Sequence, residues 1–294
     1  VGAFSVSDNG VLVYRNGLSA TGNVQWAWFD RTGKAVETFG TPGPYRGVDV
    51  SPDGKRIAVH RHDGTGGDIW LFESARRGNM LRFTFDATQD NSMPIWVPDG
   101  SRIAFGSLRN GKWGIYQKPA NGTGREELLF ESDLPKMPMS WTPDGKFIIF
   151  WVSDPKTGSD QWVLPLAGDR KPVPFLQTPF NENHSQISPD AKWIAYYSNE
   201  TGRSEVYVRP FPSGEGKWQI STDGGVFPRW RQDGKELFYM GAASLGKIIS
   251  VKVNPAGPTF EYGDPVELFA SGYVNFTPGL NYHTYAVSAD GQRF

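Results

Sequence analysis

One stretch of the sequence decides the fold, and it reads Val48-Asp49-Val50-Ser51-Pro52-Asp53-Gly54-Lys55-Arg56-Ile57-Ala58-Val59. A Ser-Pro-Asp-Gly turn stands between two runs in which apolar residues alternate. Proline presets φ at the second turn position, aspartate bonds to nearby amides, and glycine takes the positive φ that ends the turn. Alternation with a period of two is typical of β-strands. The stretch therefore predicts two antiparallel strands joined by a tight turn.

The same turn recurs along the whole chain, at intervals of 43 to 46 residues and a last interval of 57 residues. Such a regular period indicates a repeat architecture. The other copies are Ser7-Asp8-Asn9-Gly10, Val97-Pro98-Asp99-Gly100, Thr142-Pro143-Asp144-Gly145, Ser188-Pro189-Asp190-Ala191, Arg231-Gln232-Asp233-Gly234 and Ser288-Ala289-Asp290-Gly291.

Each repeat also carries a third and a fourth strand-like run, as in residues 68–72 and 82–85 of the second copy. Four antiparallel strands in a repeat of this length are typical of a propeller blade. We therefore predict an all-β fold, a single β-propeller domain over residues 1–294. It has six full repeats and a partial seventh, and the sequence leaves a six-bladed or a seven-bladed ring open. The predicted repeats are 1–44, 45–90, 91–135, 136–181, 182–224, 225–279 and the partial 280–294.

Composition agrees with this fold and excludes several functions. The 294 residues include 35 Gly, 22 Pro and 11 Trp, which suits many short strands and tight turns. The formal charge is −1 without a basic patch, so we expect no nucleic-acid partner. No long apolar run is present, so we expect no membrane insertion of this segment. Cysteine is absent, which excludes disulfides and thiolate metal sites. The start at Val1 suggests a piece of a longer protein.

Four stretches carry a resemblance to a known family: Arg82-Phe83-Thr84-Phe85-Asp86, Tyr197-Ser198-Asn199-Glu200-Thr201-Gly202-Arg203, Glu205-Val206-Tyr207-Val208-Arg209-Pro210-Phe211-Pro212 and Asp233-Gly234-Lys235-Glu236-Leu237-Phe238-Tyr239. With the repeated turn, they resemble the TolB-like, WD-repeat-like propellers, and most closely the C-terminal propeller of bacterial membrane-bound serine/threonine kinases. The resemblance implies a sensing or protein-binding module in an extracytoplasmic, periplasmic location. The kinase motifs themselves are absent, and His60-Arg61-His62-Asp63 lies between two blade strands rather than in a catalytic loop.

The repeated aspartates and tryptophans have structural explanations. Each turn aspartate, such as Asp53, is expected to bond within its own turn rather than hold a metal. Tryptophans precede the turn in several repeats, and we expect Trp96, Trp141 and Trp230 to pack between blades.

The candidate functional residues lie in loops that the repeat does not constrain. In a propeller, the loops entering the inner strands and the loops joining the second and third strands gather at one channel mouth. Residues predicted to bind a ligand there are Arg46, His62, Asp63, Lys136 and Tyr282. Further polar loop residues are Arg15, Arg109, Asp154, Lys156 and Glu200.

A metal-dependent reaction is the alternative at the same mouth. Oxygen ligands such as Asp90, Asn91, Glu182 and Asn183 suit Ca²⁺, and His184 and His283 are candidate catalytic bases. Propeller lactonases use a channel Ca²⁺ in this way, although none of their motifs is present. No motif demands a cofactor, and Ca²⁺ is the one candidate.

Two functions therefore stand side by side. The first is a binding module for a protein, peptide or small-molecule ligand, which uses the channel mouth or the blade rims. The alternative is a Ca²⁺-dependent hydrolase of lactones or related esters, with the metal in the central channel. The sequence leaves open whether the protein is an enzyme.

Overall fold

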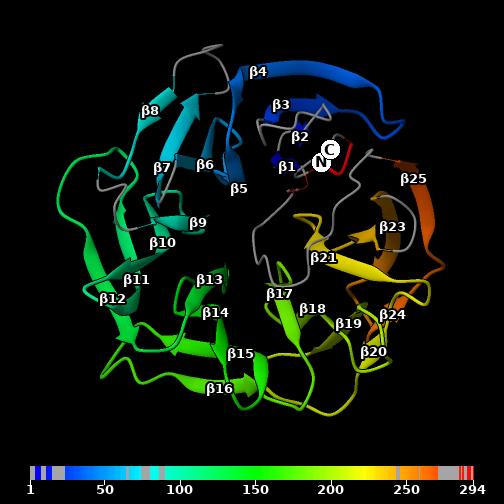
Figure 1. Ribbon diagram of the computed structural model, residues 1–294. Coiled ribbons are helices and arrows are strands. Elements are labelled where there is room, and N and C mark those ends of the chain that lie inside the picture. Colours follow the sequence, from blue (N-terminus) through cyan, green and yellow to red (C-terminus); the bar gives the residue numbers. More distant parts are fainter. Residues whose placement is uncertain are drawn as a thin grey trace.

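The computed structural model describes residues 4–7, 11–14, 24–63, 66–73, 80–85, 90–242, 246–257, 259–270, 285, 287, 290–292 and 294. Every helix-or-strand element within these ranges is a β-strand. The strands form antiparallel sheets arranged in a ring around a central axis (Figure 1). The protein is thus an all-β propeller with four-stranded antiparallel blades.

Five blades are complete in the described part of the chain. In each, the chain passes outward from the innermost strand through consecutive hairpins. The strands of the first two are β5 (Tyr45–Val50), β6 (Arg56–Asp63), β7 (Gly66–Glu73) and β8 (Met80–Arg82), then β9 (Ser92–Trp96), β10 (Arg102–Arg109), β11 (Lys112–Pro119) and β12 (Glu127–Ser132).

The next three blades continue the same order around the ring. Their strands are β13 (Lys136–Trp141), β14 (Phe147–Asp154), β15 (Gly158–Pro165) and β16 (Val173–Leu176); β17 (Glu182–Ile187), β18 (Trp193–Ser198), β19 (Glu205–Pro210) and β20 (Trp218–Gln219); and β21 (Gly225–Trp230), β22 (Glu236–Gly241), β23 (Lys247–Asn254), β24 (Glu261–Tyr262) and β25 (Val266–Ala270). In the last blade, β24 and β25 both pair with β23, which makes that sheet five-stranded.

The remaining sector of the ring contradicts the predicted count of six or seven blades. It contains two separate two-stranded sheets, β1 (Phe4–Ser7) with β2 (Val11–Tyr14) and β3 (Val24–Phe29) with β4 (Ala35–Gly43). Figure 1 shows them between the β5–β8 blade and the β21–β25 blade. The described part of the chain therefore has five complete blades rather than six or seven. In this sector Phe294, from the far end of the sequence, exchanges two backbone hydrogen bonds with Phe29 of β3.

The innermost strand of each complete blade is irregular near its middle. The pairing of the first and second strands shifts register in all five blades, as a β-bulge does. In three of them the displaced residue has a left-handed backbone, namely Met93 at φ 53°, His184 at 49° and Phe227 at 55°. Such a backbone is costly for residues other than glycine, and the three side chains are buried in compensation.

The repeated turns form as the sequence predicts. Oδ1 of Asp53 accepts hydrogen bonds from the Ser51 hydroxyl at 2.6 Å and from the Lys55 amide at 3.1 Å. Equivalent bonds to the amide two residues later are made by Asp99, Asp144, Asp190, Asp233 and Asp290. The local, structural interpretation of these aspartates is therefore confirmed.

Two of the three repeated tryptophans tie one blade to the preceding one. Nε1 of Trp96 in β9 donates to the backbone oxygen of Asp49 in β5 at 3.3 Å, and Nε1 of Trp230 in β21 donates to that of Gln186 in β17 at 3.0 Å. Trp141 belongs to a buried cluster that joins β9 and β13. Packing between blades is thus confirmed for the tryptophans.

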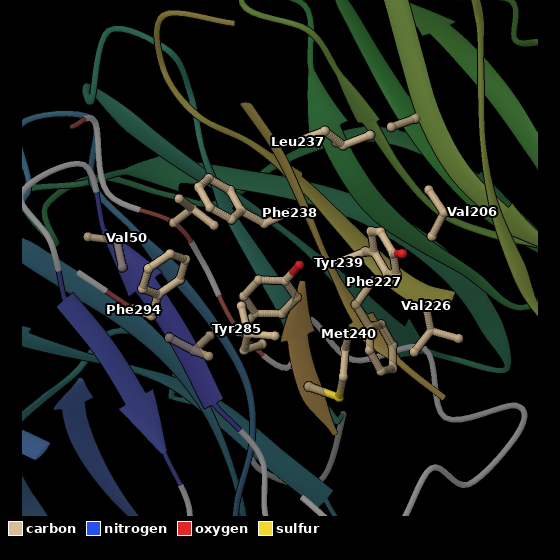
Figure 2. Packing of buried hydrophobic residues seen from close by; sticks show 14 of the residues in the cluster. Val50, Val206, Val226, Phe227, Leu237, Phe238, Tyr239, Met240, Tyr285 and Phe294 are labelled. Carbon is tan, nitrogen blue, oxygen red and sulfur yellow. The ribbon is translucent and has the colours of Figure 1, made fainter. Parts of the chain in front are cut away.

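A buried apolar cluster connects the last blade to the sector where the chain ends meet. Figure 2 shows Phe294 and Tyr285 beside Phe238 and Tyr239 of β22 and Val50 of β5. Phe294 is fully buried and lies edge-on to Phe238, with ring centres 5.0 Å apart. The ring is therefore completed by side-chain packing as well as by the backbone pair at Phe29.

The described residues include no helix that is long and apolar enough to cross a membrane.

Candidate functional site

One end of the ring carries the loops that enter the innermost strands and the turns that join second to third strands; we call it the loop face. The opposite end, with the Pro-Asp-Gly turns, is the turn face. On the loop face, each entering loop is hydrogen-bonded to the end of the second strand of its blade or to the turn that follows. The five contacts are His62 N to Pro44 O, Arg109 Nη2 to Asn91 Oδ1, Ser153 N to Pro135 O, Asn181 N to Asn199 Oδ1 and Ala242 N to Gly224 O, at 2.8–3.2 Å.

A group of two histidines and one carboxylate lies on this face. His60 and His62 alternate on β6, so that both side chains leave the same side of the strand. Asp90 comes from the loop that enters β9 of the next blade. Its Oδ1 is 3.2 Å from Nε2 of His60 and 3.0 Å from Nδ1 of His62. The two imidazole rings are perpendicular, with centres 5.7 Å apart.

The side chains of this group become more exposed from His60 through His62 to Asp90. The exposed fraction of the side chain is 0% for His60, 16% for His62 and 26% for Asp90. Burial lowers the pKa of His60, an effect that Asp90 opposes and the charge of Arg46 reinforces. Burial raises the pKa of Asp90, but hydrogen bonds and charge from His60 and His62 outweigh it, so that the pKa is below its ordinary value.

The backbone around the group leaves room for the His60 ring. A Cβ on Gly67 of β7 would lie 2.2 Å from Nε2 of His60, closer than any real contact. The amide of Asn91 donates to the Gly67 oxygen at 2.8 Å, which fixes the loop that carries Asp90. A glycine at this position is therefore a steric requirement of the histidine pair.

Asn91, predicted as a metal ligand, is held in a separate network of the same loop. Its side-chain nitrogen donates to Asp68 at 3.1 Å, and its oxygen accepts from Ser107 at 2.9 Å and from Arg109. Asp68 also accepts from Thr84 at 2.5 Å and pairs with Arg82. These bonds anchor the loop that carries Asp90.

The residues Glu182, Asn183 and His184 are buried in β17, where the inner strand bulges. His184 stacks on Tyr197, with ring centres 5.6 Å apart, and meets Phe227 edge-on at 4.5 Å. Burial, with a smaller effect of Arg229, holds the pKa of His184 well below its ordinary value. The candidate base is thus a neutral histidine packed among aromatic rings.

Glu182 is a buried carboxyl with an incomplete set of partners. One of its oxygens accepts from the Thr178 hydroxyl, and Oε2 has no hydrogen-bond partner among the described residues. Burial raises the pKa of Glu182 to about 7; the bond from Thr178 opposes the shift and the charge of Asp160 adds to it. The β13–β16 blade stands between Glu182 and Asp90, so the structure does not bring the four predicted Ca²⁺ ligands together.

Replacing Glu182 by glutamine should remove a pH dependence of stability. Below its ordinary pKa of 4.5, Glu182 is protonated in both the folded and the unfolded state. As the pH rises towards 7, the unfolded state loses this proton first, so native stability should fall by up to about 3 kcal/mol. Glu182→Gln should lack this fall and be the more stable protein above pH 7, measured by urea unfolding from pH 4 to pH 8.

The exposed Glu215 offers a matched control, because Glu215→Gln makes the same change without burial. Its stability should follow the native pH profile. Parallel profiles for the native protein and Glu182→Gln would contradict a raised pKa at Glu182.

The other predicted ligand-binding residues are spread over the loop face. Lys136, 1% exposed, donates from Nζ to the backbone oxygens of Trp113 and Ser132, both at 3.1 Å, and of Leu134. Burial lowers the pKa of Lys136 to about 8. Asp63 pairs with Arg61 at 2.9 Å, and Arg46 is half-buried beside the histidine group. Tyr282 and His283 lie outside the described residues.

Sequence reasoning did not select His60, although a signal was present. Histidines at positions 60 and 62 of a strand with a period of two must share a face. The sequence predicts only His62 and Asp63 of this run as ligand-binding residues, and it groups Asp90 with Glu182 as a metal ligand instead of with the histidines.

The ring of antiparallel blades defines the protein as a β-propeller. Comparisons with known proteins agree with this fold. A protein assigned as TolB from Agrobacterium tumefaciens superposes with a TM-score of 0.68 at 19% identity, covering 92% of this chain and 95% of that one. TolB from Acinetobacter baumannii gives a TM-score of 0.56 at 15% identity, over 90% and 68% of the two chains. The periplasmic gluconolactonase of Pseudomonas aeruginosa gives 0.56 at 13% identity, over 91% and 85%. The fold is therefore a TolB-like β-propeller.

The sequence relatives combine too little identity with too little coverage to assign the chain to a family. An uncharacterized protein of Agrobacterium fabrum is 24% identical over 216 residues, which cover 71% of this chain and 70% of the relative. Tricorn protease homolog 1 of Streptomyces coelicolor is 32% identical over 140 residues, which cover 44% of this chain and only 12% of the relative. No protein-family model matches the chain.

Proposed function

We propose that the protein is a binding module that recognises a protein, peptide or small-molecule ligand on its loop face. The observation that carries the proposal is the set of five contacts, one per complete blade, that fix the entering loops to the ends of the second strands. Loops that are already ordered lose little conformational entropy on binding. A rigid ring that presents such loops suits recognition.

The surroundings of the candidate base favour binding over hydrolysis. His184 is 2% exposed and packs against Tyr197 and Phe227, which leaves its imidazole poorly placed to activate a water molecule. The TolB-like fold and the likeness to kinase propellers support a sensing role, and with it an extracytoplasmic location, as parts of the same proposal.

Charge reversal on the two faces tests the proposal. Ligands would be found by a thermal-shift screen of peptides, saccharides and small molecules, and protein partners by cross-linking. Lys112→Glu with Lys156→Glu changes exposed positions of the loop face, while Lys55→Glu with Lys146→Glu makes the same change on the turn face. We expect the loop-face pair to weaken binding about tenfold or more, and the turn-face pair to leave it within about twofold.

Two outcomes would overturn the proposal. One is binding that is lost in the turn-face pair and kept in the loop-face pair. The other is turnover across an ester and lactone panel that EDTA abolishes and Ca²⁺ restores, because such turnover would establish the calcium-dependent hydrolase instead.

A further inference from the structure

We propose that His60, His62 and Asp90 form a binding site for one transition-metal ion, of which Zn²⁺ is the best-suited example. The site goes beyond the binding function proposed above and does not depend on it. It joins the second strand of one blade to the entering loop of the next.

The positions of the three donor atoms fit a single ion. One ligand atom from each of His60, His62 and Asp90 lies within 4.8 Å of the other two. The nitrogen-to-oxygen distances of 3.2 Å and 3.0 Å are close to the ~3.3 Å separation of ligand atoms in a tetrahedral zinc site with bonds of about 2.0–2.1 Å. Small side-chain movements would therefore suffice to coordinate the ion.

The donor types select the kind of metal. Imidazole nitrogen suits zinc, iron, nickel and copper, and two histidines with one carboxylate form a common set of three ligands. Ca²⁺ prefers six to eight oxygen ligands, which this group lacks. The structure thus points to a different metal from the Ca²⁺ that the sequence suggests and, apart from Asp90, to different ligands.

The burial of the three side chains points to a site that is open on one side. His60 is fully buried, whereas His62 and Asp90 reach the surface. Closed structural zinc sites use four protein ligands, while three protein ligands leave a position for water or an exogenous ligand. A ligand of the loop face with a carboxylate or another anionic oxygen donor is the chemistry that this position would take. The nearby charge of Arg46 favours an anion there.

The surroundings hold the ligands in place independently of a metal. Gly67 leaves the space for the His60 ring, the His62 amide is bonded to Pro44, and Asn91 fixes the loop next to Asp90. Preorganised ligands of this kind raise metal affinity. A plain hydrogen-bonded triad would show the same distances, so the two possibilities must be separated by experiment.

Metal titration of the whole chain distinguishes a metal site from a hydrogen-bonded triad. The protein is treated with a chelator, dialysed and titrated with Zn²⁺, Mn²⁺ and Co²⁺ by calorimetry; the visible spectrum of bound Co²⁺ reports its coordination. We expect one ion per chain with a dissociation constant of about 1 μM or tighter for Zn²⁺. His62→Ala and the isosteric Asp90→Asn should each weaken binding by about 100-fold or more.

Asp133→Asn is the matched control, because it neutralises an exposed carboxylate in the corresponding loop that enters β13 of the next blade. It should bind Zn²⁺ as the native protein does, and circular dichroism should show the native fold for every variant. The absence of stoichiometric binding by the native chain would overturn the proposal. Binding that survives both His62→Ala and Asp90→Asn would also overturn it, since the ion would then lie elsewhere.

Discussion

Replacing Phe294 by alanine should lower the free energy of unfolding by about 3–5 kcal/mol, the range found for fully buried aromatic residues. The ring of Phe294 is 0% exposed. It lies edge-on to Phe238 at 5.0 Å and to Phe269 at 5.6 Å, and the Arg31 guanidinium is 5.5 Å from its centre. Alanine keeps the backbone hydrogen bonds to Phe29, so the loss should report the packing that completes the ring.

Urea unfolding of Phe294→Ala and of a control, Phe85→Ala, would measure this effect. Phe85 is 69% exposed, and its removal should cost no more than about 1 kcal/mol. A loss below 1 kcal/mol for Phe294→Ala would contradict the view that the two ends of the chain are packed together.

The blades could be predicted because their information is local. A Pro-Asp-Gly turn between alternating strands specifies a hairpin without reference to the rest of the chain, and the positive φ values of Gly54, Gly100, Gly145 and Gly234 bear this out. The blade count could not be obtained in the same way. It depends on which segments pair in the sector of the chain ends, and the contact between Phe29 and Phe294 spans almost the whole sequence.

The candidate site also combines features that the local sequence indicates with features that only the tertiary structure brings about. Asp90 lies in the loop that enters β9, but its partners come from β6 of the preceding blade, and only tertiary packing brings them together. Glu182 and His184 were expected at the mouth because they precede a turn by the right number of residues. The bulge of β17 and the left-handed backbone of His184 place these side chains in the interior instead. A left-handed non-glycine residue has no reliable sequence signal.

Buried polar groups on this face divide into those that fix loops and those that are placed to bind. Asp68 and Glu205 both lie in the first half of a third strand, and each accepts a hydrogen bond from the hydroxyl of a residue that follows the fourth strand, Thr84 or Ser221. This repetition in two blades indicates a structural role. The histidine pair with Asp90 has no such counterpart among the described blades, which is what a site peculiar to one position requires.

The sequence predicts Lys136 as a ligand-binding residue. One substitution distinguishes this role from a role in fixing a loop. Lys136→Met should lower the free energy of unfolding by about 3–4 kcal/mol, because three partly buried carbonyl oxygens would lose a charged donor. Methionine nearly matches the length of lysine, so packing changes little. Lys118→Met is the matched control: Lys118 is also buried, but its Nζ donates to one carbonyl, that of Phe83 at 2.8 Å, and the cost should be near 1–2 kcal/mol.

The comparison separates two roles for the same ammonium group. Unfolding by urea gives the stability of both variants, and the ligands of the loop-face screen give their binding. A large loss of stability with unchanged ligand affinity in the folded fraction would indicate that Lys136 stabilises the β12–β13 connection. A stable Lys136→Met protein that has lost its ligand would contradict this and restore the ligand contact that the sequence suggests. The three carbonyl contacts, which leave the ammonium no further hydrogen to donate, favour the first result.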